Sequence, residues 1–272
     1  MTTEPQRVSR AADLRTRFLT ALAIGPAFLV IMYVGGALLA AVLAAAFARL
    51  YYEWDRMTRS SSLDREYWCF AGVGILGIIV AWQTIAVYGA IILLLAAGVI
   101  LAIRGGAFWN AAGFFYIGAA GIAFMTIDGR AGGAFLLLWL STTVFATDIG
   151  AYAVGRYFGG PKMAPSISPK KTWSGFVGGL LGAVIWSFGI LIVFKYSVTP
   201  GWVLSAFIVS AIGQMGDLLE SGLKRQFDVK DTGQLLPGHG GLLDRVDSLL
   251  AAVIIVAILA SFTPLFSPNF SA

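Results

Sequence analysis

The chain has 272 residues, of which 58% are hydrophobic and 12% are charged, and its formal net charge is +5. Soluble globular domains carry about 25% charged residues, so this composition excludes an ordinary water-soluble protein and favours a membrane protein. The single cysteine, Cys69, excludes a disulfide framework or a multi-thiolate metal site within one chain. The basic residues form no separate domain with interleaved aromatics, so we expect no nucleic-acid partner.

Apolar stretches separated by glycine, proline and charge clusters follow one another along the whole chain. A transmembrane helix needs about 20 apolar residues. We predict spans at residues 18–33, 36–50, 67–82, 86–103, 111–127, 132–154, 175–194, 202–215 and 246–266. The predicted fold is therefore all-α, a polytopic helical membrane protein with about nine transmembrane helices.

The distribution of basic residues predicts the orientation. Arg7, Arg10, Arg15 and Arg17 precede the first span, which by the positive-inside tendency puts the N-terminus in the cytoplasm. The apolar run 18–50 is much longer than a signal-peptide core, so we expect no cleavage. With nine spans, all Lys and Arg residues except Arg130 and Lys195 lie on the cytoplasmic side.

This topology divides the chain into a basic cytoplasmic tail (1–17), N-terminal transmembrane helices (18–130) and a catalytic transmembrane region (131–272). The catalytic region contains the polar loops 155–174 and 216–245, and both are predicted to be cytoplasmic. These two loops and the residues beside them carry the candidate chemistry.

The first group of polar residues spans 148–175 and reads DIGAYAVGRYFGGPKMAPSISPKKTWSG. Asp148 lies inside an apolar helix, where an ionised group costs at least ~2.5 kcal/mol, so we expect a partner or a polar cavity. A simple hydrogen bond between packed helices is the alternative. The following loop is basic and rich in glycine and proline, a composition that can wrap an anion.

Two adjacent lysines in this loop, Lys170 and Lys171, lie between the hydroxyl residues Ser168 and Thr172. A helix begins just after them, and its free backbone N–H groups also favour phosphate. We interpret the element SPKKT as part of a phosphate pocket. The alternative is an orientation signal that lies on anionic lipid headgroups.

The second group spans 216–248 and reads GDLLESGLKRQFDVKDTGQLLPGHGGLLDRVDS. If its start is helical, polar residues at three- and four-residue spacing share one face: Asp217, Glu220, Ser221, Lys224 and Asp228. A solvated amphipathic surface helix is the alternative reading of this stripe alone.

Further along, glycines and Pro237 surround His239 and predict a tight turn that lets backbone approach a ligand closely. Asp244, Arg245 and Asp247 then stand at the start of the last span. Magnesium usually takes one or two protein carboxylates and completes its shell with water and phosphate, and we choose Asp217 and Asp244 as its ligands. A lone histidine cannot build a common zinc site. A structural role in the turn is one alternative for His239, and among functional roles we favour a hydrogen bond to phosphate or to the aspartates over general-base work.

The segment 221–248 resembles the signature of the phosphatidate cytidylyltransferases, also called CDP-diacylglycerol synthases. The shared residues are Ser221, Lys224, Arg225, Lys230, Asp231, Pro237, His239, Gly240, Gly241, Asp244, Arg245 and Asp247. The SPKKT element is also similar to this family, as are the upstream residues Asp148, Ala151, Tyr152, Gly155 and Arg156. The resemblance therefore covers roughly the C-terminal half. Ser174 stands where the family carries an acidic residue, which leaves the role of that acid open in this chain.

The resemblance implies that CTP and phosphatidic acid react to give CDP-diacylglycerol and pyrophosphate, with Mg²⁺ required and a second cation left open. It implies metal ligation by Asp217 and Asp244. The implied catalytic residues are Asp217, Lys224, Asp231, His239, Asp244, Arg245 and Asp247. The implied substrate-binding residues are Asp148, Arg156, Ser168, Lys170, Lys171, Thr172, Ser221, Arg225 and Lys230.

The same resemblance implies a homodimer in a bacterial inner (plasma) membrane, with the site facing the cytoplasm. Gly178 and Gly182, four residues apart in one span, add a weak packing signal for the dimer.

Two other classes of protein compete with this reading. A transporter or channel is suggested by Asp148 and the many spans, but no internal repeat is visible. Another membrane phosphotransferase, such as a CTP-dependent lipid kinase or a CDP-alcohol phosphotransferase, is the enzymatic alternative. The spaced-aspartate motif of the CDP-alcohol phosphotransferases is absent from the sequence.

Overall fold

The computed structural model describes residues 25–59, 65–83, 87–103, 108–233 and 240–262. The predicted basic tail, Arg104, Pro237 and His239 lie outside the described residues. After a short helix at Gly25–Val34, the helices are α2 (Gly36–Arg59), α3 (Arg65–Trp82), α4 (Val87–Ile103), α5 (Phe108–Asp128), α6 (Gly133–Phe158), α7 (Trp173–Val193), α8 (Pro200–Gln226) and α9 (Leu243–Phe262). A hairpin of β1 (Lys162–Ala164) and β2 (Ser168–Thr172) connects α6 to α7.

The prediction of a polytopic helical membrane protein is confirmed. In the described part of the chain, seven helices are long and apolar enough to cross a membrane, namely α2, α3, α5, α6, α7, α8 and α9. Two further apolar helical segments, Gly25–Val34 and Ala90–Val99, are shorter. The count of nine spans and the cytoplasmic N-terminus stay predictions.

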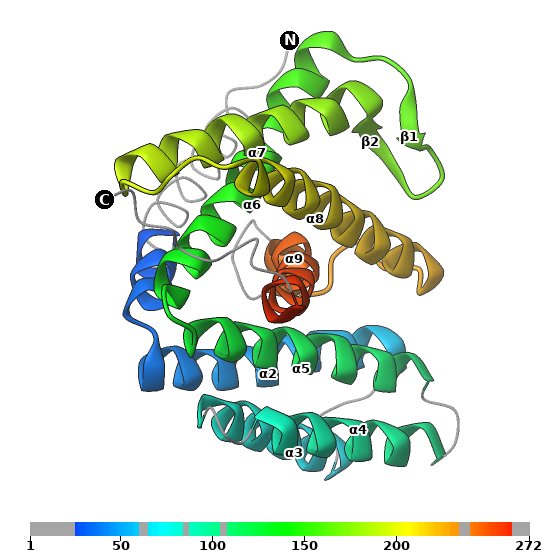
Figure 1. Cartoon of the computed structure of the whole chain (residues 1–272). Coiled ribbons are helices and arrows are strands. Elements are labelled where there is room, and N and C mark those ends of the chain that lie inside the picture. The colour runs from blue at the N-terminus through cyan, green and yellow to red at the C-terminus, as the bar shows by residue number, and fades with distance from the viewer. Residues whose placement is uncertain (1–24, 60–64, 84–86, 104–107, 234–239, 263–272) are drawn as a thin grey trace, which may run out of the picture.

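The helices form two groups on either side of α9. Figure 1 shows α3 and α4 as an outer layer beneath α2 and α5, and α9 in the middle of the molecule between α5 and α8. Helices α6 and α7 pack against each other, and α8 packs against both of them. Apolar residues from both halves of the chain form one continuous core that includes Phe47, Phe114, Trp139 and Val253.

Several helices run further than the apolar pattern predicted. Helix α2 continues to Arg59 instead of residue 50, and α8 continues to Gln226 instead of residue 215. The backbone hydrogen bonds of a helix do not require apolar side chains, so a helix can leave the apolar layer without ending. Helix α8 therefore carries most of the predicted polar stripe, but Asp228 lies beyond its end with a left-handed φ of 54°.

Glycines bring α6 and α7 unusually close. A Cβ at Gly178 would lie 2.8 Å from the carbonyl oxygen of Gly150, and one at Gly182 would lie 2.9 Å from that of Ala146. The pair predicted as a dimer signal thus packs two helices of the same chain. That observation removes the glycine pair as a signal for a dimer, and the dimer implied by the family resemblance stays a prediction.

Candidate active site

The two polar groups predicted from the sequence meet in the folded chain. The Nζ of Lys171, on β2, lies 2.8 Å from Oδ2 of Asp217, on α8. On the same face, the Nε of Arg225 lies 3.4 Å from the carbonyl oxygen of Ile167. The hairpin and the C-terminal half of α8 therefore form one polar surface, as expected if the two loops lie on the same side of the membrane.

Strand β2 explains why two adjacent lysines differ. Successive side chains of a strand point to opposite faces. Lys171 is half-buried against α8, whereas Lys170 is exposed. Ser168 pairs with Ala164 at the other end of the hairpin ladder. Only Lys171 of the two lysines contacts a predicted metal ligand among the described residues.

A second lysine joins α8 to α9. The Nζ of Lys224 lies 3.0 Å from Oε1 of Glu220 and 2.7 Å from Oδ1 of Asp244. Glu220 and Lys224 are one helical turn apart, as are Asp217 and Ser221, whose side chains lie 3.4 Å apart. The predicted face of α8 is confirmed for these four residues.

Five carboxylates lie close enough to interact in this region. Asp247 experiences the negative charges of Glu220, Asp217 and Asp148, and Asp148 is also near Lys171. Two lysines are in direct contact with members of this group. Lys171 contacts Asp217, and Lys224 contacts Glu220 and Asp244. Such an excess of carboxyl groups beside apolar helices favours either protonation of some of them or binding of a further cation. Asp148 is exposed and lies within electrostatic reach of Asp217, Asp247 and Lys171, so its expected partner stays a prediction.

Close packing of α8 on α9 sets the register of the aspartates. A Cβ at Gly216 would lie 3.1 Å from the carbonyl oxygen of Asp247. Asp217 is therefore level with Asp247, whereas Asp244 is level with Lys224 and one turn nearer the connecting loop. Asp247 also accepts a hydrogen bond at its carbonyl oxygen from the hydroxyl of Tyr116, on α5, at 3.2 Å.

Asp244 holds the loop before α9. Its Oδ2 accepts hydrogen bonds from the backbone N–H of Thr232 at 3.0 Å, from the Thr232 hydroxyl at 3.0 Å and from the N–H of Gly241 at 2.9 Å. Its Oδ1 accepts from Lys224. A carboxylate has about four lone-pair sites, so Oδ1 retains capacity for one more ligand.

The carboxylates of this cluster suit magnesium better than a metal ion whose ligands all come from the protein. In the described ranges, no group of three His, Cys, Asp or Glu side chains is arranged to hold a metal ion. Magnesium does not need such a cage, because water and phosphate oxygens fill most of its coordination sphere. One or two carboxylates from Asp217, Asp244 and Asp247 would be sufficient. The choice of Asp217 and Asp244 stays a prediction.

Other predicted site residues lie around this cluster. Arg156, Lys230, Asp231 and Arg245 are exposed. The guanidinium of Arg156 lies 3.3 Å from the hydroxyl of Tyr152 and over its ring. Exposure of these four side chains is compatible with the predicted substrate contacts, which stay predictions.

Two hydroxyl residues of the SPKKT region have structural contacts. Thr172 is buried and caps α7 by accepting a hydrogen bond from the N–H of Gly175 at 3.1 Å. Ser174, which replaces the expected acid, donates to the carbonyl oxygen of Gly159 and lies 3.0 Å from the Thr172 hydroxyl. Ser174 therefore links the start of α7 to the end of α6.

The sequence reasoning missed Glu53, on α2. Its side chain is fully buried and its carboxylate accepts from the N–H groups of Leu242 and Leu243 at 3.0 and 2.8 Å. It also pairs with Arg49 at 2.9 Å. Apolar patterning gave no signal for it, because the predicted span ended at residue 50 and left Glu53 in a charged segment. Its spacing of four residues from Arg49, typical of a helical ion pair, was the available signal.

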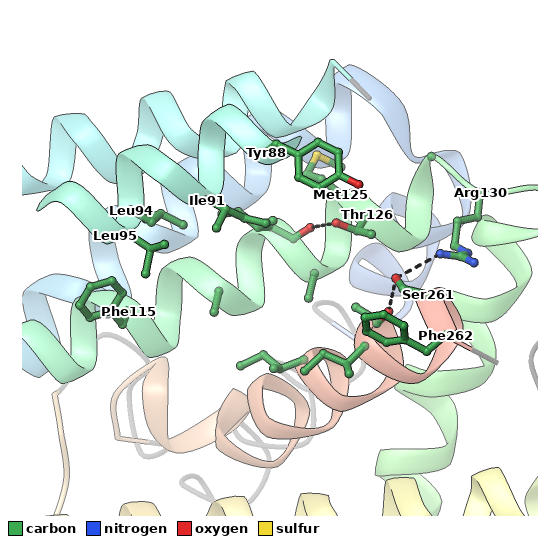
Figure 2. Close-up of a pocket in the computed structure, with 17 residues that line it drawn as sticks. Tyr88, Ile91, Leu94, Leu95, Phe115, Met125, Thr126, Arg130, Ser261 and Phe262 are labelled. Atoms are coloured by element: carbon green, nitrogen blue, oxygen red, sulfur yellow. Dashed lines mark hydrogen bonds between the residues drawn. The ribbon is translucent and has the colours of Figure 1, made fainter. Parts of the chain in front are cut away.

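A separate pocket lies away from this cluster. It has a volume of about 770 Å³ and lies between α4, α5 and α9. Figure 2 shows Arg130 and Ser261 at one end of it and Leu95 and Phe115 at the other. Its α9 lining begins at Ile254, about two turns beyond Asp247. Its walls are mostly apolar, so it does not supply the phosphate chemistry of the charged cluster.

Comparison with known proteins agrees with this geometry. Residues 15–263 match the model of the Cytidylyltransferase family. A phosphatidate cytidylyltransferase of Brucella suis is 37% identical over 262 residues, which cover 94% of this chain and 95% of that protein. Enzymes of the same name from Staphylococcus saprophyticus and Haemophilus influenzae are 44% identical over 146 residues and 47% identical over 127 residues. These matches cover 53% and 44% of this chain, and 56% and 44% of the respective relatives. The chain belongs to the cytidylyltransferase family of nucleotidyl-transferring enzymes.

Proposed function

We propose that the protein makes CDP-diacylglycerol and pyrophosphate from CTP and phosphatidic acid, with Mg²⁺, at the cytoplasmic face of a bacterial inner membrane. The name of the relatives supports the substrates. A phosphate oxygen of phosphatidic acid attacks the α-phosphorus of CTP. The bond from that phosphorus to the bridging oxygen breaks, and pyrophosphate leaves with the bonding electrons.

The observation that carries the proposal is the contact between Lys171 and Asp217, which joins two distant motifs into one charged cluster. Nucleotidyl transfer depends on positioning phosphates and on neutralising the charge that develops on them. The cluster combines lysines and carboxylates at the ends of apolar helices. A lipid phosphate and a water-soluble triphosphate can therefore both reach it.

Asp217 and Asp244 are the proposed metal ligands, and Asp247 is within electrostatic reach of Asp217. Bound Mg²⁺ would neutralise the phosphates of CTP and the charge on departing pyrophosphate. The ionised lipid phosphate needs no general base. For this reason His239 is proposed to donate a hydrogen bond to phosphate or to the aspartates.

The chain's cations and hydroxyls orient the substrates. Lys171 and Lys224 already contact the proposed metal ligands and would bind phosphate oxygens beside them. The exposed residues Arg156, Lys170 and Lys230, together with Arg225, would attract the triphosphate and the headgroup from the aqueous side.

The deciding experiment supplies purified protein with phosphatidic acid, Mg²⁺ and CTP labelled at the α-phosphate. We expect the label in chloroform-soluble lipid and an equal amount of pyrophosphate. Parallel reactions with CTP labelled at the γ-phosphate detect a lipid kinase, and unlabelled CDP-diacylglycerol with an alcohol acceptor detects a CDP-alcohol phosphotransferase. Lipid that carries only the γ-label would refute the proposal.

The proposed orientation has its own test. Lys162 is exposed in the hairpin, so Lys162→Cys in a Cys69→Ser background provides one accessible thiol. In intact cells, a membrane-impermeant maleimide should label it only after the inner membrane is permeabilised. Labelling without permeabilisation would place the hairpin on the outer side of that membrane. Whether the enzyme is a dimer would be measured by mass photometry in detergent.

A further inference from the structure

The loop before α9 is held from both sides by carboxylates that come from opposite halves of the chain. Asp244 contacts it from α9, as described above. Glu53 contacts it from α2, almost 190 positions earlier in the sequence. The Thr232 hydroxyl lies between them, 3.0 Å from Oδ2 of Asp244 and 3.3 Å from Oε2 of Glu53.

Glu53 is well suited to fix this loop. Its two oxygens accept from the N–H groups of Leu242 and Leu243, which stand at the beginning of α9. The first N–H groups of a helix lack intrahelical partners and carry the positive end of its dipole, so a buried carboxylate there is strongly favoured. Arg49 balances the charge at 2.9 Å.

Two glycines make room for this carboxylate. A Cβ at Gly233 would lie 2.7 Å from Oε1 of Glu53, and a Cβ at Gly241 would lie 2.7 Å from Oε2. At Gly241 the added carbon would also collide with the Thr232 hydroxyl. The backbone at Gly233 and at Gly241 is thus packed directly against the Glu53 side chain.

We propose that Glu53 is a positioning residue for the transfer reaction, which acts through Thr232 and the start of α9 to hold Asp244 and its partner Lys224 in place. This inference rests on the proposed function. Glu53 itself lies behind the loop, fully buried, and does not face the polar surface. A shift of the loop would move Asp244 away from Lys224, and displacements of about 1 Å in a site of this kind reduce rates by about 100-fold.

The test compares Glu53→Gln with Glu66→Gln. Both changes remove a carboxylate of the N-terminal half that pairs with an arginine, but Glu66 is exposed and lies 3.0 Å from Arg59. In Glu53→Gln the amide NH₂ must face a backbone N–H donor, so one helix-terminal contact is lost. We expect kcat to fall by about 10- to 100-fold with protein that inserts and remains dispersed. Glu66→Gln should stay within twofold of wild type.

Hydrogen–deuterium exchange separates positioning from general destabilisation. Exchange should accelerate in the peptide that covers 240–248 and remain unchanged in α6 and α7. A normal kcat in folded Glu53→Gln would overturn the inference, and so would equal acceleration of exchange throughout the protein.

A second pair of variants tests the same inference in case the Glu53→Gln protein does not fold. Thr232→Val removes the hydroxyl between the two carboxylates with little change in shape, whereas Thr232→Ser keeps it. We expect a loss of about tenfold in kcat for the valine variant and near-normal activity for the serine variant. Equal activity of the two would refute the inference. If wild-type protein does not transfer the CTP label, the proposed function fails, whereas exchange at 240–248 still tests the contact with Glu53.

Discussion

Replacing Lys171 with alanine, with Lys170→Ala as the matched control, tests how the charged cluster is built. The two residues are neighbours with the same charge, and they differ in the face of β2 from which they project. Lys171 contacts Asp217 at 2.8 Å, whereas Lys170 is exposed. An orientation signal would use both lysines alike. A phosphate site would depend on Lys171.

For Lys171→Ala, the geometry predicts a small loss of folding free energy and a larger loss of kcat/KM. The side chains of Lys171 and Asp217 are 23% and 36% exposed, so solvent screening limits their ion pair to about 0.2–1 kcal/mol of folding free energy. A hydrogen bond from an ammonium group to a phosphate that it positions contributes about 1.5–3 kcal/mol. At about 1.36 kcal/mol for each factor of ten, the loss corresponds to about 10- to 150-fold in kcat/KM.

The assay measures initial rates of label transfer from CTP to lipid in mixed micelles, with each substrate varied in turn. For Lys171→Ala we expect a higher KM for the substrate whose phosphate the lysine binds, and a thermal unfolding midpoint close to that of wild type. For Lys170→Ala we expect an unchanged kcat and a much smaller rise in KM than for Lys171→Ala, because an exposed charge attracts the substrates only through solvent. Equal effects of the two substitutions, whether small or large, would refute the reasoning.

Asp217→Asn should abolish Mg²⁺-dependent transfer while the protein still inserts, and full activity would remove this residue from the proposed metal site. Asp244→Asn should abolish transfer and also lower the thermal unfolding midpoint, because Asp244 accepts four hydrogen bonds from the protein. The midpoint is measured by differential scanning fluorimetry, and an unchanged value would contradict the role of Asp244 in holding the loop. Gly241→Ala should lower activity by at least about tenfold, because the added carbon would collide with Thr232 and Glu53. Gly72→Ala is the control and should behave like wild type in the same assay, because no atom lies within 4 Å of its added carbon. Chelation of divalent cations by EDTA should reduce transfer to background and added Mg²⁺ should restore it; transfer that persists in EDTA would rule out the proposed metal.

The local arrangement on α8 could be predicted because it follows from helical periodicity. Residues three and four positions apart share a face in any helix, so the grouping of Asp217, Glu220, Ser221 and Lys224 needed no tertiary information. The meeting of the two loops could be inferred from the charge asymmetry, which places both on one side of the membrane. Contact between Lys171 and Asp217 is consistent with that inference.

Features that depend on tertiary contacts could not be predicted. The start of α9 lies at Leu243 and not at residue 246, because the cap that satisfies its first N–H groups comes from Glu53 on a distant helix. Hydropathy marked that helix as ordinary membrane-spanning sequence. Likewise, the close packing of Gly178 on α6 is indistinguishable in sequence from a contact between two copies of the chain.

The packing of Gly233 and Gly241 around Glu53 has a consequence for how this family can diverge. A shorter acid at position 53 would withdraw from both glycines and leave space for a methyl group, so drift at these three sites has to be coordinated. Alignments of many relatives should therefore show correlated substitution between a position in the second helix and two positions nearly 200 residues later. Such covariation would report a physical contact between the two halves of the chain.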